Sequence, residues 1–234
     1  MNKNYLKGPV EMNWIDHGKY FELNIPQGDQ GWLEGRIGRV TTSVSGGLAG
    51  NSRFKTPEEQ GLIIAGMQES FTEEAIERMN HGTRTEPDAR KWYAKKSGYK
   101  VVERGLIVPK WDYRLGASVD GDVIGTDGII EIKCPVRMYK PLSWYSQQIQ
   151  AGWEPPSDYY RHIWPTHYDQ MQHAMAVMDK KWCVYIVYAI EDQEIFTQTI
   201  PFNPSYWSQH YKTLIQNYNK YVVPNLKPNY PICP

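Results

Sequence analysis

The sequence predicts one domain of the α/β (α+β) class, in which helices flank a central mixed β-sheet. Three observations support this prediction: helix-start signals dominate the first third, short β-type runs follow Gly98, and helical spacing returns around a late hairpin. A chain of 234 residues is long enough to bury the core of one such domain. We expect a single domain over residues 1–234, with a loose N-terminal arm at 1–30 and a Pro-rich tail at 224–234.

The first third is expected to be mainly helical. A hydroxyl side chain can cap the free N–H groups at a helix start, and Pro is favoured in the first turn. On this basis, helices begin at Thr42 or Ser43, at Thr56, at Thr72 and near Thr85. The first should stop at glycines 46–47, and the last should end at Ser97 and Gly98.

Three short runs of β-type composition come next, over residues 99–108, 113–119 and 128–134. The segments between them, 109–112 and 120–128, are rich in turn-forming residues. We therefore expect a meander of three strands.

The rest of the chain combines helices with one hairpin. Helical spacing is present around Trp144 and over 166–178, where Met171, Met175 and Met178 share one helix face. Residues 182–190 and 194–200 are expected to pair as a hairpin, and 204–223 to form a closing helix.

Composition excludes some classes of protein and leaves nucleic-acid binding open. The sequence contains no run of about 18 apolar residues, the length needed to span a bilayer. The first residues lack the apolar segment of a secretion signal. Three widely spaced cysteines favour a reducing interior, either the cytoplasm or the inside of a host cell, and no structural zinc. The net charge is zero, although basic residues exceed acidic ones over 84–114. Ordinary solvated helix faces explain that excess equally well.

Two segments, 116–121 and 128–135, carry the residues with the clearest chemistry. Alternate side chains of a strand share a face, so Glu131 and Lys133 should project together while Ile130, Ile132 and Cys134 face the opposite layer. Asp120 ends the preceding run, and a turn through the intervening glycines can bring its carboxylate close to Glu131. We therefore expect a small acidic cluster with one lysine.

Two carboxylates at such a separation repel each other unless a cation lies between them, and oxygen ligands suit Mg²⁺ or Mn²⁺. A metal of this kind supports phosphodiester hydrolysis, in which Lys133 can orient water or offset negative charge. Glu86 is a candidate further ligand, directly or through water. A surface hairpin with an ordinary ion pair remains the alternative.

Four sequence blocks add to this interpretation. They are residues 32–43, with Trp, Arg-x-Gly and Thr-x-Ser; residues 81–89, with Gly-x-x-x-Glu-x-x-Ala; the core at 118–134; and residues 168–172, with Tyr followed by Gln-x-Gln. In this order they resemble the family of phage lambda exonuclease and viral alkaline exonucleases (YqaJ-type viral recombinases) in the PD-(D/E)xK nuclease superfamily. The resemblance runs from about residue 32 to 189 and implies a restriction-endonuclease-like fold.

The resemblance also implies a role for each matching residue. The metal ligands would be Asp120, Glu131 and Glu86, and the catalytic lysine would be Lys133. The pocket for a terminal 5′-phosphate would be formed by Arg36, Thr41, Ser43, Ser118 and Gln170. A guanidinium and a helix start are both suited to binding an anion.

The chain departs from the family in two places. Val119 stands where the family often has Pro before the metal-binding Asp, which alters the turn without removing a ligand. An aromatic segment at 144–165 is longer than in the lambda enzyme. It is either packing over the core or a wedge that stacks on bases where the duplex parts.

The expected activity is a metal-dependent 5′-to-3′ exonuclease that acts on duplex DNA ends and leaves 3′ single-stranded overhangs for recombination or repair. A PD-(D/E)xK endonuclease and a catalytically silent DNA-end-binding protein are the alternatives. The resemblance implies a ring of three subunits around DNA, and a single-strand annealing protein is a possible partner. A ring could turn its basic residues toward a central channel, which would reconcile zero net charge with DNA binding.

Overall fold

A computed structural model describes residues 13–136, 163–189 and 194–227 of the chain. The N-terminal half contains β1 (Trp14–Asp16), β2 (Tyr20–Leu23), α1 (Gln30–Arg36), β3 (Val40–Thr41), α2 (Thr42–Ala49), α3 (Pro57–Ile64), α4 (Glu73–Ser97) and β4 (Val101–Val102). It is followed by β5 (Leu106–Pro109), β6 (Leu115–Gly116), β7 (Gly121–Val123), β8 (Gly128–Lys133), α6 (Pro165–Met178), β9 (Trp182–Ala189), β10 (Glu194–Pro201) and α7 (Pro204–Asn217). A π-helical turn (Tyr218–Val222) and a 3₁₀ turn (Val223–Asn225) extend α7.

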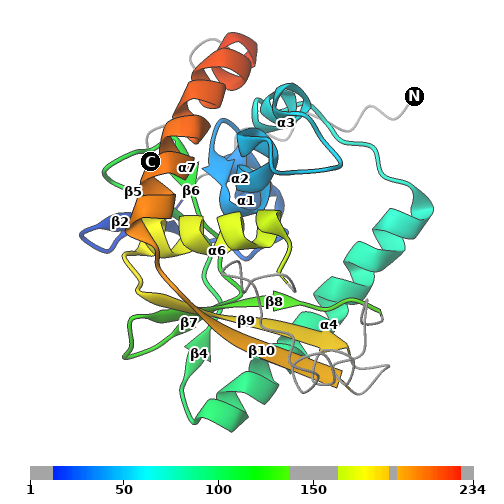
Figure 1. The fold of residues 1–234 in the computed structure, drawn as a ribbon, viewed down its shortest axis with the longest axis vertical. Coiled ribbons are helices and arrows are strands. Elements are labelled where there is room, and N and C mark those ends of the chain that lie inside the picture. Colours follow the sequence, from blue (N-terminus) through cyan, green and yellow to red (C-terminus); the bar gives the residue numbers. More distant parts are fainter. Residues whose placement is uncertain (1–12, 137–162, 190–193, 228–234) are drawn as a thin grey trace, which may run out of the picture.

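The central sheet has five strands in the order β10-β9-β8-β7-β4, and it is mixed because β8 and β9 run parallel while the other neighbours are antiparallel. A three-stranded sheet, β1-β2-β5, and a parallel pair, β3-β6, lie beside it. Helices pack on both faces of the central sheet (Figure 1). The predicted α/β class with a central mixed sheet is confirmed.

Alternation along β8 separates two cores. Ile130 and Ile132 pack with Ala89 and Tyr93 of α4 on one face of the sheet. Ile129 packs on the other face with the methionines of α6, among them Met171. The period-two pattern expected for this strand is therefore present, and it places Glu131 and Lys133 on the α6 side.

Two helix predictions need correction. The helix expected to stop at glycines 46–47 begins at Thr42, after Thr41 as its N-cap, and continues to Ala49, where Gly50 ends it in the left-handed conformation. The two helices expected around Thr72 and Thr85 are one helix, α4, with Pro87 inside it. Burial of Ala89 and Tyr93 against the sheet outweighs the helix-breaking tendency of Pro87.

The meander prediction is wrong. The first expected strand is divided between β4 and β5, which belong to different sheets, and β6 pairs with β3. The partner of β8 is β7, inside the segment expected to be a loop. Gly105 explains the division of the first strand, because a Cβ atom there would lie 2.2 Å from the Leu23 carbonyl oxygen, so only a glycine allows β2 to approach.

Other predictions have mixed outcomes. The capped helix at Thr56, the helix at 166–178 and the β9–β10 hairpin are confirmed. Residues 14–23, expected in a loose arm, instead form β1 and β2, which pair with each other, and β2 also pairs with β5. The expected helix around Trp144 lies outside the described residues. Among the helices that the structure describes, none combines the length and apolar character needed to cross a membrane.

Candidate active site

Strand β8 presents a carboxylate and an ammonium group side by side. Lys133 Nζ lies 2.6 Å from Glu131 Oε1, and the Glu131 side chain is almost fully buried. The same ammonium donates to Gln170 Oε1 at 3.2 Å, which links β8 to α6. Tyr185 lies beside Glu131 on β9 and shares a hydrogen bond of 2.9 Å with His167. Lys133 is therefore held from two sides.

Asp120 joins this pair from the residue that precedes β7. Because β7 and β8 are antiparallel neighbours, with Gly121 opposite Ile130, the turn returns Asp120 to the end of β8 that carries Glu131. The Asp120 Oδ2 atom accepts a hydrogen bond from the Ile132 backbone N–H at 2.6 Å. The proximity expected for these two carboxyl groups is thus present, although it arises from a two-strand hairpin and not from the predicted meander.

Helix α4 supplies the third acidic residue together with an arginine that the sequence analysis did not assign to the site. Arg90 Nη2 donates to Glu86 Oε1 at 2.6 Å, and its Nη1 atom lies 2.9 Å from Glu103 Oε2. The Arg90 Nε atom also donates to the backbone carbonyl of Asp120. One guanidinium therefore fixes both Glu86 and the Asp120 backbone. The i,i+4 spacing of Glu86 and Arg90 was the signal available in the sequence.

The carboxyl groups of this cluster resist ionisation. Burial, followed by the charge of Glu131, raises the pKa of Asp120 to about 7. Burial, followed by the charge of Asp120, raises the pKa of Glu86 to about 7. Burial also raises the pKa of Glu131, against the opposing effect of Lys133. Burial alone would lower the pKa of Lys133, but the charges of Glu131 and Asp120 outweigh it and keep the ammonium protonated.

The raised pKa values show that these buried carboxyl groups have too little positive charge around them. A divalent cation would supply that charge, so the residues fit a cation site. The donors are hard oxygens, which suit Mg²⁺ or Mn²⁺. No group of three His, Cys, Asp or Glu side chains within the described ranges gathers to enclose a cation. Asp120 and Glu131 are the two buried carboxyl groups there that could hold such a cation, and Arg90 holds Glu86.

The same pKa shifts predict how metal binding depends on pH. The folded-state pKa values lie above those of the unfolded chain, so between about pH 4 and pH 7 the unfolded chain loses protons first and the fold loses stability as pH rises. Mg²⁺ should therefore raise the melting temperature more at about pH 8 than at about pH 5.5, by an extra 2–4 °C or so. Differential scanning fluorimetry measures this; Asp120→Asn should weaken the response, and equal shifts at both pH values would contradict the prediction.

A second polar cluster surrounds Arg36 at the end of α1. Its Nη2 atom donates to Thr41 Oγ1 at 3.1 Å and to Ser43 Oγ at 2.8 Å. The guanidinium lies over the Trp32 ring, 4.2 Å from its centroid. Trp32 in turn donates from Nε1 to Ser118 Oγ at 2.9 Å. The predicted Arg36, Thr41, Ser43 and Ser118 therefore belong to one connected group.

The electrostatics of this group favour an anion. Burial lowers the pKa of Arg36 to about 10, and no acidic side chain in the described part of the chain forms an ion pair with it. Helix α2 begins at the same place, and the Thr41 side chain does not cap its first N–H groups. A desolvated cation beside a free helix start is suited to a phosphate.

Gln170, predicted for the phosphate pocket, lies instead beside Lys133. Among the described residues, the Gln170 side chain has one hydrogen bond, which it accepts from Lys133, and none with the Arg36 group. Ser118 connects the two clusters along the chain, because it precedes Asp120 by two residues. The Arg36 cluster is therefore linked through Ser118 to the segment that carries Asp120.

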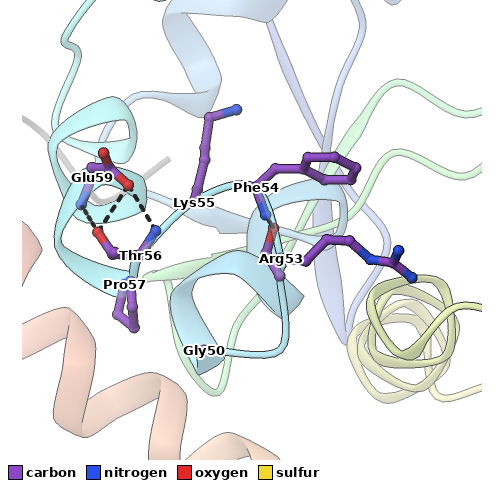
Figure 2. Close-up of a pocket in the computed structure, with 8 residues that line it drawn as sticks. Gly50, Arg53, Phe54, Lys55, Thr56, Pro57 and Glu59 are labelled. Atoms are coloured by element: carbon purple, nitrogen blue, oxygen red, sulfur yellow. Dashed lines mark hydrogen bonds between the residues drawn. The ribbon is translucent and has the colours of Figure 1, made fainter.

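A pocket of about 330 Å³ lies apart from both clusters, in the loop after α2, and it is shown in Figure 2. Its lining includes Arg53, Phe54 and Lys55. Arg53 lies over the ring of Trp164, 4.0 Å from the centroid, and Phe54 is strongly exposed. Trp164 is the one aromatic residue of the 144–165 segment that falls among the described residues.

Comparison with known proteins gives a family and a fold. A family model described as YqaJ-like viral recombinase domain matches residues 31–181, more than half of the chain. No curated protein sequence matches the chain.

Solved structures of similar fold include two of an alkaline exonuclease from Laribacter hongkongensis. The complex of this exonuclease with dAMP has a TM-score of 0.63 at 25% identity, and the second structure has a TM-score of 0.61 at 25% identity. Both matches cover 84% of this chain and 94% of the exonuclease. A phage-related exonuclease from Haemophilus somnus 129PT matches with a TM-score of 0.50 at 14% identity, over 79% of this chain and 93% of the other, and shares the fold.

Proposed function

Because the chain belongs to the YqaJ-like viral recombinase domain family, we propose that it is a divalent-metal-dependent exonuclease acting on the ends of duplex DNA. It digests the 5′-ended strand and leaves a 3′ overhang for recombination or repair. The observation that carries the proposal is the assembly of Asp120, Glu131 and Lys133 at one end of β8. The similarity to an alkaline exonuclease supports it.

The chemistry follows from the charges of the site. Asp120 and Glu131 would hold Mg²⁺ or Mn²⁺, with Glu86 at the edge, and the metal, when bound, polarises a phosphoryl oxygen and acidifies a water molecule. Lys133, protonated and held by Glu131 and Gln170, orients the attacking water or offsets the negative charge that develops on the phosphate. Arg90 keeps Glu86 and the Asp120 backbone in place.

The cluster around Arg36 is proposed to receive the terminal 5′-phosphate. Among the described residues no carboxylate pairs with Arg36, and Thr41 and Ser43 add hydroxyl groups at a helix start. Ser118 and Gln170 extend the pocket toward the acidic cluster. A phosphate fixed there would set which phosphodiester bond reaches Lys133.

Arg36→Ala should selectively impair digestion of phosphorylated ends, because the guanidinium is assigned to the terminal phosphate and not to the metal. We expect kcat/KM on 5′-phosphorylated duplex to fall about 10- to 100-fold, the range for loss of a charge-assisted hydrogen bond. Activity on 5′-hydroxyl ends should already be low and change little. An unchanged ratio of the two activities in Arg36→Ala would show that the pocket is assigned wrongly.

Two other functions are separated by one assay. Linear blunt duplex with and without 5′-phosphate, incubated with Mg²⁺, should be shortened progressively from its ends by an exonuclease. Discrete internal fragments would indicate an endonuclease of the same superfamily. Binding of ends without any metal-dependent release of nucleotide would indicate a silent end-binding protein.

We propose further that the chain acts as one nuclease domain inside cells and that three copies form a ring around DNA. Four apolar side chains of the α3–α4 connection and of the first half of α4 are about half exposed, as expected of a surface that another subunit covers: Met67, Phe71, Ile76 and Met79. A single-strand annealing protein would receive the 3′ overhang.

A further inference from the structure

A set of buried polar side chains connects three helices, α2, α6 and α7, close to the Arg36 cluster. Ser45 Oγ of α2 lies 2.8 Å from His210 Nε2 of α7, and His210 Nδ1 lies 3.4 Å from Asp169 Oδ1 of α6. Ser45 and Asp169 are 0% exposed, and His210 is 6% exposed. These three residues, which we call the Ser45–His210–Asp169 chain, have no part in the chemistry described above.

Further donors complete the environment of Asp169. Asn51, just after α2, donates from Nδ2 to Asp169 Oδ2 at 2.8 Å, and the Tyr206 hydroxyl donates to Asp169 Oδ1. Burial lowers the pKa of His210, against the opposing charge of Asp169. A neutral imidazole that carries its proton on Nδ1, the nitrogen 3.4 Å from Asp169 Oδ1, leaves Nε2 to accept the Ser45 hydroxyl proton. His210 therefore joins Ser45 by a hydrogen bond and approaches Asp169 in a polar contact of 3.4 Å.

A serine, a histidine and an aspartate in this order also occur in enzymes with a nucleophilic serine. That role requires a serine that a substrate can reach, and Ser45 is fully buried. The pocket at the loop after α2 does not include it. A role in positioning the helices is left for these three residues, because no substrate can reach Ser45.

Two of the three helices, α2 and α6, are in close contact at Gly46. A Cβ atom on Gly46 would lie 2.8 Å from the Thr166 Cα atom and 2.9 Å from Asp169 Oδ2, so the backbones of α2 and α6 touch there. Ser45 follows Ser43 of the Arg36 cluster by two residues, and Asp169 directly precedes Gln170. A shift between α2 and α6 would therefore change the distance between the Arg36 cluster and Lys133.

We propose that the Ser45–His210–Asp169 chain is a positioning device that holds the start of α2 at a fixed distance from Gln170, and so determines the selectivity for 5′-phosphorylated ends. The inference rests on the proposed function. Ser45, His210 and Asp169 are positioning residues, because they reach the substrate only through Ser43 and Gln170. Ser45 is bonded to His210, and Asp169 is bonded to Asn51 and Tyr206, so this buried polar network can specify one arrangement of the packed helices.

The test is Ser45→Ala, which removes one hydroxyl without adding volume. Using Mg²⁺ and linear duplex, the ratio of kcat/KM on 5′-phosphorylated ends to that on 5′-hydroxyl ends should fall about tenfold, equivalent to roughly 1.4 kcal/mol. The fall should appear as a higher KM on phosphorylated ends, with kcat on hydroxyl ends unchanged. Fluorescence anisotropy with the same two duplexes in EDTA should show the same loss of discrimination. His210→Gln, whose amide can still bond Ser45, should retain more of the ratio than His210→Phe.

Tyr211→Phe is the matched control. Tyr211 follows His210 in α7, and its hydroxyl donates to Asp112 at 2.8 Å, outside the Ser45–His210–Asp169 chain. The ratio of this variant should equal that of the wild type. If Ser45→Ala does not fold, Tyr206→Phe removes one donor to Asp169 and carries the same test. A folded variant with an unchanged ratio, or with equal losses on both ends, overturns the inference. A wild type without preference for phosphorylated ends overturns the end pocket and the inference together.

Discussion

Lys133→Ala should abolish hydrolysis of 5′-phosphorylated duplex while the protein remains folded. The ammonium lies 2.6 Å from Glu131 on the face of β8 that carries the acidic cluster, and its side chain is 28% exposed, so truncation removes the charge without opening a closed cavity in the core. Glu131 can accept a proton when it loses its partner, because burial already raises its pKa. We expect a loss of at least about 10²–10³-fold, as for removal of one preorganised electrostatic group.

The measurement is release of nucleotides from phosphorylated duplex in Mg²⁺, together with a melting curve and duplex binding in EDTA. Lys180→Ala is a matched control, because Lys180 Nζ also lies 2.6 Å from a buried carboxylate, that of Asp122. Arg104 remains bonded to Asp122 at 2.8 Å, so this variant should lose some stability but keep its activity. Robust hydrolysis by purified Lys133→Ala would rule out the proposed mechanism.

Asp120→Asn and Glu131→Gln should each abolish hydrolysis and, without metal, make the protein more stable. Each substitution removes a ligand charge from the cation site, and it also removes a buried negative charge that the fold accommodates poorly. The raised pKa values of both carboxyl groups express this cost. For Asp120→Asn above about pH 7 we expect a gain of about 1 kcal/mol or more, which is about 2–4 °C in melting temperature for a chain of this size.

Asp122→Asn supplies the contrast within the same hairpin. Asp122 is as deeply buried as Glu131, but Arg104 and Lys180 both lie within 2.8 Å of its oxygens. Neutralising it should therefore lower the melting temperature and spare the metal site. Equal destabilisation by Asp120→Asn and Asp122→Asn would mean that the acidic cluster carries no unbalanced charge.

The parts of the fold that depend on local signals were predictable from the sequence. The helix expected to start at Thr56 with Pro57 in its first turn is present, and the methionines of α6 lie on one buried face. Predictions that depended on tertiary contacts failed. Nothing near Pro87 in the sequence indicates that packing on β8 would carry a helix through it, and the role of Gly105 is visible only where β2 approaches.

The site shows the same division. Alternation in β8 was sufficient to place Glu131 and Lys133 on one face, because that rule is local. Arg90 was not identified, because its guanidinium contacts the Asp120 backbone thirty residues further along the chain. The roles of Asp120, Glu131, Lys133 and the Arg36 cluster in catalysis stay predictions, and the experiments above address them.

The parallel pairing of β8 with β9 also constrains the order in which the protein folds. The β7–β8 and β9–β10 hairpins join residues close in sequence, whereas residues 128–133 pair with 182–187 across a long stretch of chain. Closing that longer loop costs more chain entropy than closing either hairpin, so the two hairpins form before they join. Lys133 meets Gln170, and Glu131 meets Tyr185, only at that joining step. During synthesis the contacts of Glu131 and Lys133 with Tyr185 and Gln170 are therefore expected to form only after β9 has left the ribosome.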